Sequence, residues 1–164
     1  MERSEEETLR RVADGDLVEL EILCRRHATK LCNFAYRLLW DWADVEEAAQ
    51  ETMFRVFKLA LDGHFDDDPD IFLSTMYTIA VNLCMERVSG RRRSDSAAEA
   101  QPSERVDEAL AGLTANHRAA LLLKNYNGLD YSEIARALNC STNQVKMLVY
   151  QARRQMADVV RDSG

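Results

Sequence analysis

Hydrophobic residues recur every three or four positions along most of the chain, a spacing that gives an α-helix one apolar face. In the N-terminal part this pattern predicts helices over residues 16–39, 44–61 and 71–88. The segment between the last two, residues 64–70, is rich in aspartate and contains Pro69, which a helix interior does not tolerate. We therefore expect an exposed loop there.

Side chains that can cap helices mark the starts of the first two helices. Asp16 can accept hydrogen bonds from the free backbone N–H groups at the start of the first helix. Asp44 and Glu47 have the spacing of a capping box at the start of the second. The third helix is expected to end before Gly90, and the arginines at 91–93 would suit the negative end of its dipole.

The C-terminal part predicts shorter helices, whose expected starts are Ser103, Thr114, Asp130 and Ser141. The last two carry the strongest signals, because Asp130 with Glu133 and Ser141 with Gln144 both have capping-box spacing. Asn139 lies between these helices and can adopt the left-handed conformation that ends a helix. The sequence thus predicts a helix, a tight turn and a second helix.

Composition and the segment between the two parts favour a two-domain protein. The 164 residues are 46% hydrophobic and include only two prolines and six glycines, which indicates an all-α fold. Residues 94–103 offer almost nothing to bury and contain a proline, so they are expected to be a flexible linker. The predicted domains are residues 1–93 and 104–164.

Charge is distributed unevenly along the chain. The net charge is -7, which argues against extensive contact with nucleic acid, because phosphate contacts require Lys and Arg. However, residues 1–93 carry most of the excess acid, whereas residues 142–157 contain basic side chains and no acid. Any affinity for DNA is therefore expected to be local.

Several other classes of protein are not supported. No apolar run approaches the roughly 20 residues needed to cross a bilayer, and the acid-rich start does not resemble a signal peptide, so we expect a cytoplasmic protein. Cys24, Cys32, Cys84 and Cys140 are scattered within apolar patterns and are expected to be buried, reduced thiols. His27 lies near the first two, but closely spaced ligand pairs are absent, so core packing is favoured over zinc. Recognisable catalytic motifs are also absent, so we expect no metal, no cofactor and no enzymatic activity.

The two parts together resemble the extracytoplasmic-function (ECF) group of bacterial RNA polymerase sigma factors. Residues 44–58, Asp-Val-Glu-Glu-Ala-Ala-Gln-Glu-Thr-Met-Phe-Arg-Val-Phe-Lys, resemble the family's most specific motif, in sigma region 2. Residues 79–82 and 87–93 resemble the segment that meets promoter DNA, and residues 129–135 with 145–146 resemble the helix-turn-helix of region 4. The resemblance implies a region 2 bundle of three or four helices, a flexible linker and a region 4 helix-turn-helix domain.

The resemblance implies that the second helix binds the clamp-helix coiled coil of core RNA polymerase. Positions three and four apart share one helix face. The implied contact residues are Glu47, Gln50, Glu51, Phe54 and Arg55. For Phe54, a place in the core remains an alternative.

The same resemblance assigns contacts with the separated promoter strands, at the minus-ten element, to the acidic loop and the third helix. Stacking and polar contacts are implied for Phe65, Phe72, Tyr77 and Asn82. Phosphate contacts are implied for Arg87, Arg91, Arg92 and Arg93. The alternative for these arginines is a solubilising helix end.

The last helix resembles a recognition helix that enters the major groove of the minus-thirty-five element. Its apolar positions Val145, Leu148, Val149 and Ala152 are expected to pack inward. Its outward side chains and its first residues are the candidate DNA contacts, namely Ser141, Thr142, Asn143, Gln144, Lys146, Met147, Gln151 and Arg154, with Tyr150 also outside. Asn143 and Gln144 have amides that can pair with adenine.

The chain departs from the family pattern at several positions. Thr75 stands where the family usually has Trp, and Val81 where it usually has a basic residue. Leu148 and Gln151 occupy positions that commonly carry Arg, so base preference cannot be transferred from the family. We expect an unusual strand contact and a restricted set of promoters.

The leading interpretation is a sigma factor that directs core polymerase to promoters. Its implied partners are the clamp coiled coil and flap of the polymerase, promoter DNA and an anti-sigma protein, with no direct membrane insertion. Two alternatives remain: a degenerate sigma-like module that binds a regulator without supporting initiation, and a one-component transcriptional regulator that uses only its helix-turn-helix.

Overall fold

The computed structural model describes residues 3–65, 67–94 and 105–162. All regular elements in these ranges are α-helices, as the sequence predicted. They are α1 (Glu5–Ala13), α2 (Leu17–Leu39), α3 (Trp42–Leu61), α4 (Pro69–Ser94), α5 (Arg105–Ala111), α6 (Ala115–Asn125), α7 (Tyr131–Leu138) and α8 (Thr142–Asp162). Apart from residue 94, the predicted linker lies outside the described residues.

The predicted start of α2 is confirmed, whereas the predicted start of α3 is wrong. Asp16 accepts hydrogen bonds from the backbone N–H groups of the first turn of α2. At α3, the N-cap is Asp41 rather than Asp44, and its carboxylate accepts from the backbone N–H of Ala43 at 2.9 Å. The reason is a sharp connection: Trp40 ends α2 in the left-handed conformation, with φ 56°, so α3 starts almost immediately.

Helix α4 is longer than predicted at both ends. Pro69 occupies its first position, where a backbone N–H would have no partner in any case. Asp68 supports this start by accepting a hydrogen bond from the backbone N–H of Asp70 at 2.9 Å. The helix then continues through Gly90 into the arginine run. The acidic loop is correspondingly shorter than expected.

Helix α1 was not among the helices that the sequence pattern predicted. Ser4 caps this helix by accepting from the backbone N–H of Glu7, and the first turn carries three glutamates, which suit the positive end of the helix dipole. Its buried residues include Leu9 and Val12. A cap followed by acids and two apolar positions three apart was the available signal.

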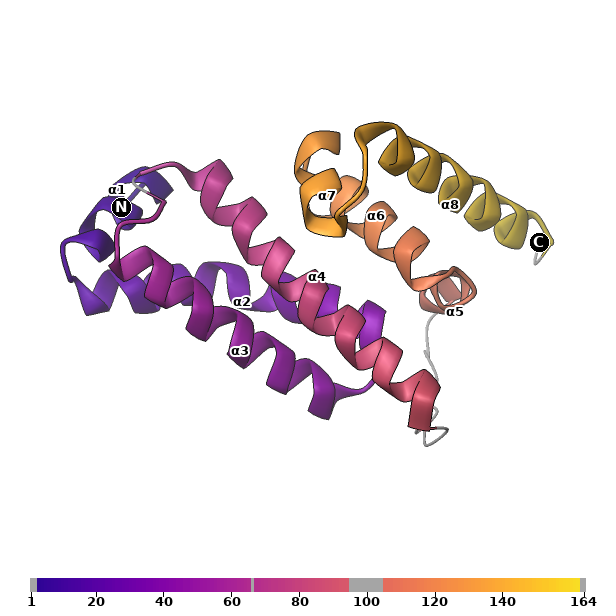
Figure 1. Cartoon of the computed structure of the whole chain (residues 1–164), viewed down its shortest axis with the longest axis horizontal. Helices are drawn as coiled ribbons and strands as arrows, with labels where there is room; N and C mark the ends of the chain where they lie inside the picture. Colours follow the sequence, from indigo (N-terminus) through magenta and orange to yellow (C-terminus); the bar gives the residue numbers. More distant parts are fainter. Residues whose placement is uncertain (1–2, 66, 95–104, 163–164) are drawn as a thin grey trace.

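Helices α1–α4 form an N-terminal bundle (Figure 1), in which α2, α3 and α4 pack against one another and α1 packs across one end. Aromatic rings contribute to its core: Phe34 contacts Tyr77 edge-on at 5.3 Å between centroids. Other large, fully buried side chains are Leu9, Leu23, Leu31, Leu38, Leu39, Phe65, Phe72 and Met76.

Helices α5–α8 form a C-terminal bundle that contains the predicted helix-turn-helix. The capping box of Asp130 and Glu133 is present at the start of α7, and Asn139 ends that helix at φ 55°. Ser141 and Gln144 exchange reciprocal hydrogen bonds, at 3.1 and 2.8 Å, where α8 begins. These local predictions are therefore confirmed.

The two bundles are packed against each other, which the sequence did not predict. Helix α7 lies along α4, and α6 lies against α2 (Figure 1). Buried residues of both bundles form one continuous apolar cluster. The C-terminal helix α8 lies on the side of its bundle away from α4.

Candidate nucleic-acid and protein interfaces

One face of α3 is polar and open to solvent. The helix buries Val45, Ala48, Thr52 and Val56 against the rest of the N-terminal bundle. The opposite side carries the predicted polymerase contacts, and all of them are exposed: Glu47, Gln50, Glu51, Phe54 and Arg55. The alternative of a core position for Phe54 is wrong, because this side chain is 55% exposed.

Neighbouring side chains hold this α3 face in a defined arrangement. Arg55 donates to the Glu51 carboxylate at 2.8 Å, one helical turn away. The Lys58 ammonium lies 4.2 Å from the centroid of the Phe54 ring, within the range of a cation–π interaction. Aromatic residues and arginine are enriched at protein interfaces, so this face is a candidate protein-binding surface.

Arg87 connects this surface to α4. Its guanidinium pairs with Glu47 at 3.0 Å and with Asp44 at 3.4 Å. The family resemblance implies a DNA phosphate as the partner of Arg87 and the polymerase as the partner of Glu47, but here the two side chains bind each other. A phosphate group would therefore have to displace two carboxylates from Arg87.

Three of the aromatic residues assigned to DNA lie in the core instead. Phe65, Phe72 and Tyr77 are each 1% exposed, so in this structure their rings have no surface to offer a nucleic acid. Phe65 packs edge-on against Phe72 at 5.3 Å, and the Phe72 ring also lies 5.2 Å from the ring of His27, on α2. The apolar periodicity already indicated this packing, whereas the family resemblance pointed to DNA.

Asn82 remains a candidate for nucleic-acid contact. It is exposed and lines a wide, open groove of about 680 Å³ between α3 and α4, together with Arg55, Met85, Glu86 and Ser89. The arginines at 91–93 belong to the last turns of α4, but their side chains lie outside the described residues.

Helix α8 presents the expected face for DNA. Val145, Val149 and Ala152 are buried, and Leu148 is half-buried. The predicted contacts are all exposed: Ser141, Thr142, Asn143, Gln144, Lys146, Met147, Gln151 and Arg154.

Residues outside α8 contact some of these side chains, and no sequence pattern predicted these contacts. A ring nitrogen of His117, in α6, lies 2.8 Å from Oε1 of Gln151. The Tyr131 ring, at the start of α7, has the ammonium groups of Lys124 and Lys146 at 4.4 and 5.6 Å from its centroid. Because His117 and Gln151 lie 34 positions apart, no local pattern could have paired them.

The described residues contain no group of three His, Cys, Asp or Glu side chains placed to hold a metal ion. The four cysteines are free thiols, and only Cys84 is fully buried; the other three are half-buried, contrary to expectation. Burial raises the pKa of Cys24, Cys32 and Cys140 above the ordinary thiol value. Within the ranges described, none of the helices is long and apolar enough to cross a membrane.

Comparison with known protein families gives two matches in chain order. The family Sigma-70 region 2 matches residues 23–94, and the family Sigma-70, region 4 matches residues 103–156.

Similar proteins of known name agree with these matches. The ECF RNA polymerase sigma factor SigE of Mycolicibacterium smegmatis is 28% identical and covers 83% of this chain, which spans only 59% of SigE. The RNA polymerase sigma-H factor of Pseudomonas aeruginosa is 23% identical and covers 93% of this chain and 91% of its own. The ECF RNA polymerase sigma factor SigM of Mycobacterium tuberculosis is 27% identical, and the match covers 95% of this chain and 84% of SigM.

Two solved structures share the fold. CnrH, in complex with the cytosolic domain of CnrY, aligns with a TM-score of 0.74 and 21% identity over 98% of this chain and 99% of its own. The sigma factor RpoE of Bartonella quintana, in complex with the anti-sigma factor NepR, aligns with a TM-score of 0.70 and 18% identity. This alignment covers 86% of this chain and 96% of RpoE. Sigma regions 2 and 4 in this order, relatives named as sigma factors, and a shared all-helical fold show that the chain belongs to the ECF group of bacterial RNA polymerase sigma factors.

Proposed function

We propose that this protein binds core RNA polymerase through α3 and directs it to promoters through α4 and α8. Its role is recognition, and the polymerase performs the chemistry. One observation carries the proposal: the α3 face and the α8 face are both exposed in the same structure, each with side chains suited to its partner. A protein with this role works beside the chromosome, in the cytoplasm.

The α3 face suits the clamp-helix coiled coil of the polymerase. Phe54 offers an exposed ring, and aromatic residues dominate the energetics of protein interfaces. Glu47, Gln50 and Glu51 surround it with hydrogen-bonding groups on one side of the helix. Such a rim of polar side chains fixes orientation around an apolar anchor.

The α8 face suits the major groove. The exposed amides of Asn143 and Gln144 can pair with adenine, although the side-chain oxygen of Gln144 already accepts from the backbone N–H of Ser141. Lys146 and Arg154 extend from the same exposed surface and suit phosphate or guanine. Residues 142–157 contain no acid, so no carboxylate of this segment opposes the phosphates.

The exposed part of α4 contacts the separated promoter strands. Asn82 lines the groove between α3 and α4, and the basic end of the helix follows within three turns. Phe65, Phe72 and Tyr77 are not included, because the core holds them.

We further propose that an anti-sigma protein controls this chain. The two solved structures described above each contain a second protein: RpoE is bound to the anti-sigma factor NepR, and CnrH is bound to the cytosolic domain of CnrY. The polymerase flap is the expected second contact on the enzyme, by analogy with the family.

Run-off transcription tests the proposal. Purified bacterial core enzyme is combined with the full chain on promoters selected from a randomised DNA library. We expect defined transcripts that require the chain. Failure to associate with core enzyme at low salt would contradict the proposal, whereas tight association without any transcript would favour the degenerate sigma-like module.

A further inference from the structure

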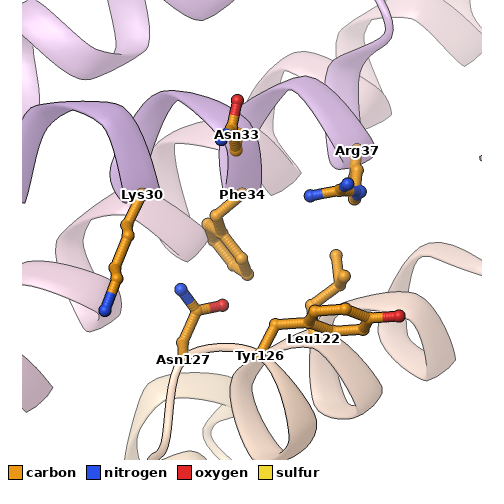
Figure 2. A pocket seen from close by; sticks show the side chains of 7 residues that line it. All are labelled: Lys30, Asn33, Phe34, Arg37, Leu122, Tyr126 and Asn127. Carbon is orange, nitrogen blue, oxygen red and sulfur yellow. The ribbon is translucent and has the colours of Figure 1, made fainter.

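The side-chain amides of this chain differ in how firmly their neighbours orient them. An amide has two ends of opposite character, because its oxygen accepts hydrogen bonds and its nitrogen donates them. Figure 2 shows two such amides at a crevice of about 160 Å³ between the two bundles. The nitrogen of Asn127 donates to the hydroxyl of Tyr77 at 2.8 Å, whereas the side chain of Asn33 has no hydrogen-bond partner among the described residues. A neighbour thus decides which end of an amide is left for a ligand.

On α8, the amide of Gln151 is held by a residue of α6. The ring nitrogen Nε2 of His117 lies 2.8 Å from the side-chain oxygen Oε1 of Gln151. An amide oxygen can only accept a hydrogen bond, so Nε2 of His117 carries a proton and donates it. The nitrogen of Gln151 has no partner within the described ranges, and the side chain is exposed. Its two N–H groups are therefore the end offered to a ligand.

The N-cap of α6 fixes the ring of His117. Thr114 caps this helix by accepting from the backbone N–H of His117 at 3.3 Å, and its hydroxyl also lies within hydrogen-bond distance of the ring nitrogen Nδ1. A neutral imidazole carries a proton on only one ring nitrogen. Because Nε2 carries it, Nδ1 accepts from the Thr114 hydroxyl. The hydrogen bonds thus run in one direction, from Thr114 through His117 to the oxygen of Gln151.

A second glutamine on the same helix is oriented in the same sense. The oxygen of Gln144 accepts from the backbone N–H of Ser141 at 2.8 Å, so its nitrogen is also the end left over. Gln144 and Gln151 lie seven positions apart, which places them on one face of α8. Lys146 and Arg154, also exposed on α8, can only donate hydrogen bonds. The exposed side of α8 is therefore rich in donors.

A row of donors favours some bases over others in the major groove. Guanine presents two acceptors there, O6 and N7, whereas adenine presents the acceptor N7 beside the N6 donor. An amide that can turn freely pairs with adenine, because its oxygen can accept from N6 while its nitrogen donates to N7. An amide whose oxygen is held by the protein offers its N–H donors, and it matches guanine better.

We propose that His117 is a positioning residue for Gln151: it holds the amide oxygen so that the NH2 group contacts DNA, and it thereby favours guanine over adenine at the base that Gln151 reads. His117 itself touches no base in this account. The inference rests on the proposed function of α8.

Nuclear magnetic resonance of the histidine ring tests the positioning contact without DNA. Proton–nitrogen spectra of the ¹⁵N-labelled full chain are recorded at about pH 8, where an ordinary imidazole is neutral. The chain has three histidines, so the signals that are absent from His117→Phe identify His117. We expect a proton on Nε2, none on Nδ1, and a shifted Nε2 signal in Gln151→Leu. A proton on Nδ1, or an Nε2 signal unchanged by Gln151→Leu, would overturn the contact.

Selection of randomised duplex DNA by the full chain at low salt tests the specificity. The base pair at which the wild type and Gln151→Leu differ is the one that Gln151 reads. We expect the wild type to prefer guanine over adenine there about fivefold or more. His117→Phe keeps a ring but removes its hydrogen bond, so the preference should be lost. His117→Gln should restore it, because its amide nitrogen can again donate to the oxygen of Gln151.

The double variant His117→Phe/Gln151→Leu separates positioning from direct contact. If His117 acts through Gln151, the double variant should select the same sequences as Gln151→Leu alone. A further loss of selectivity would mean that His117 contacts DNA or supports the fold, and it would overturn the positioning role. His64→Phe is the matched control, since His64 is exposed and lies on the other bundle. Circular dichroism of each variant verifies that helix content is retained.

The remaining outcomes distinguish this inference from the proposed function. A wild type that binds DNA without preferring guanine, or an unchanged preference in His117→Phe, overturns the role of His117 and leaves α8 as a DNA contact. If the wild type binds no duplex DNA, the proposed function of α8 and the role of His117 in specificity both fall. The magnetic resonance result alone then decides whether His117 holds Gln151.

Discussion

Arg118 illustrates how a single residue can link two bundles. It is a buried cation whose hydrogen bonds within the described residues go to backbone carbonyls rather than to a carboxylate, and its Nε has no partner there. Burial lowers the pKa of Arg118 to about 10. A charge kept in such a place costs free energy, and the carbonyl groups at the helix ends offset that cost.

Removing this side chain should destabilise the protein strongly. We expect Arg118→Ala to reduce the free energy of unfolding by about 3 kcal/mol, because it leaves a cavity and unpaired buried carbonyls. Urea denaturation measures the change. The matched control is Arg153→Ala, which removes an exposed arginine that donates to Asn125 and should cost less than about 1 kcal/mol. Equal losses in the two variants would contradict the role of Arg118.

Tyr77 is the second residue whose environment gives a measurable signature. Burial raises its pKa to about 12, although the hydrogen bond from Asn127 acts in the opposite direction. Since the folded state holds this proton more tightly than the unfolded state, the associated stability is present below pH 10 and is lost as pH rises from about 10 to about 12.

Titration of tyrosinate absorbance checks this expectation. The difference between the wild type and Tyr77→Phe isolates one phenol, which we expect to ionise well above pH 10.0, the ordinary value for tyrosine. If this phenol ionised near pH 10.0, the Tyr77 ring would not be buried in the folded protein.

At the scale of elements, local sequence signals define the helix-turn-helix closely. The carboxylate of Asp130 accepts from the backbone N–H of Glu133 at 2.8 Å, and Glu133 returns a bond to the backbone N–H of Asp130 at 3.1 Å. The hydrogen bonds that the Asp130 carboxylate accepts from the backbone N–H of Glu133 and from the hydroxyl of Ser132 lower the pKa of Asp130. The start of α7 is thereby fixed before any tertiary contact is considered.

Removing this cap should lower the free energy of unfolding modestly, by an amount that depends on pH. We expect Asp130→Ala to cost about 1 kcal/mol at neutral pH, a value typical of N-caps. Because the folded-state pKa is lowered, the stabilisation is present above the unfolded pKa and disappears as pH falls through the folded value. Thermal unfolding of the variant and of Asp158→Ala, an exposed α8 control, at neutral and acidic pH measures the difference. A loss that did not shrink in acid would contradict the capping account.

On helix α3, a substitution of an exposed residue should change binding to the polymerase without changing the stability of the fold. Phe54 is 55% exposed, so Phe54→Ala should change the free energy of unfolding little but weaken binding to core polymerase about tenfold or more. Fluorescence anisotropy of the labelled chain titrated with core enzyme measures the affinity. Leu17→Ala is the control, since Leu17 is 67% exposed on a different helix. Equal affinity for the wild type and Phe54→Ala would remove α3 from the polymerase interface.

At the scale of the whole molecule, charge limits how the free chain meets DNA. The net charge is -7, but the acid-free segment of α8 faces outward. Binding to duplex DNA should therefore be weak and should involve few phosphates. Each phosphate contact adds about 0.9 to the slope of the logarithm of affinity against the logarithm of salt concentration.

Lys146→Gln tests that electrostatic account. If Lys146 contacts a phosphate, its loss should reduce the salt slope by about 0.9 and weaken binding equally on all sequences. Lys58→Gln, on α3, is the control with the same change of charge and should leave the slope unchanged. Salt titrations of duplex binding by the free chain measure both. An unchanged slope in Lys146→Gln would place Lys146 outside the DNA contact.

The sequence by itself determined the class of fold, most helices and the helix-turn-helix, because periodicity and capping act between residues a few positions apart. The same local rules left Phe72 and Tyr77 ambiguous, since an apolar face can meet a core or a ligand, and only the packing of α4 on α2 and α7 decided it. The pairing of Arg37 with Asp107, 70 positions away, and that of Arg118 with Leu38, 80 positions away, also needed the tertiary structure. Such contacts depend on how the helices pack against one another, and the residues that make them follow no regular spacing in the sequence.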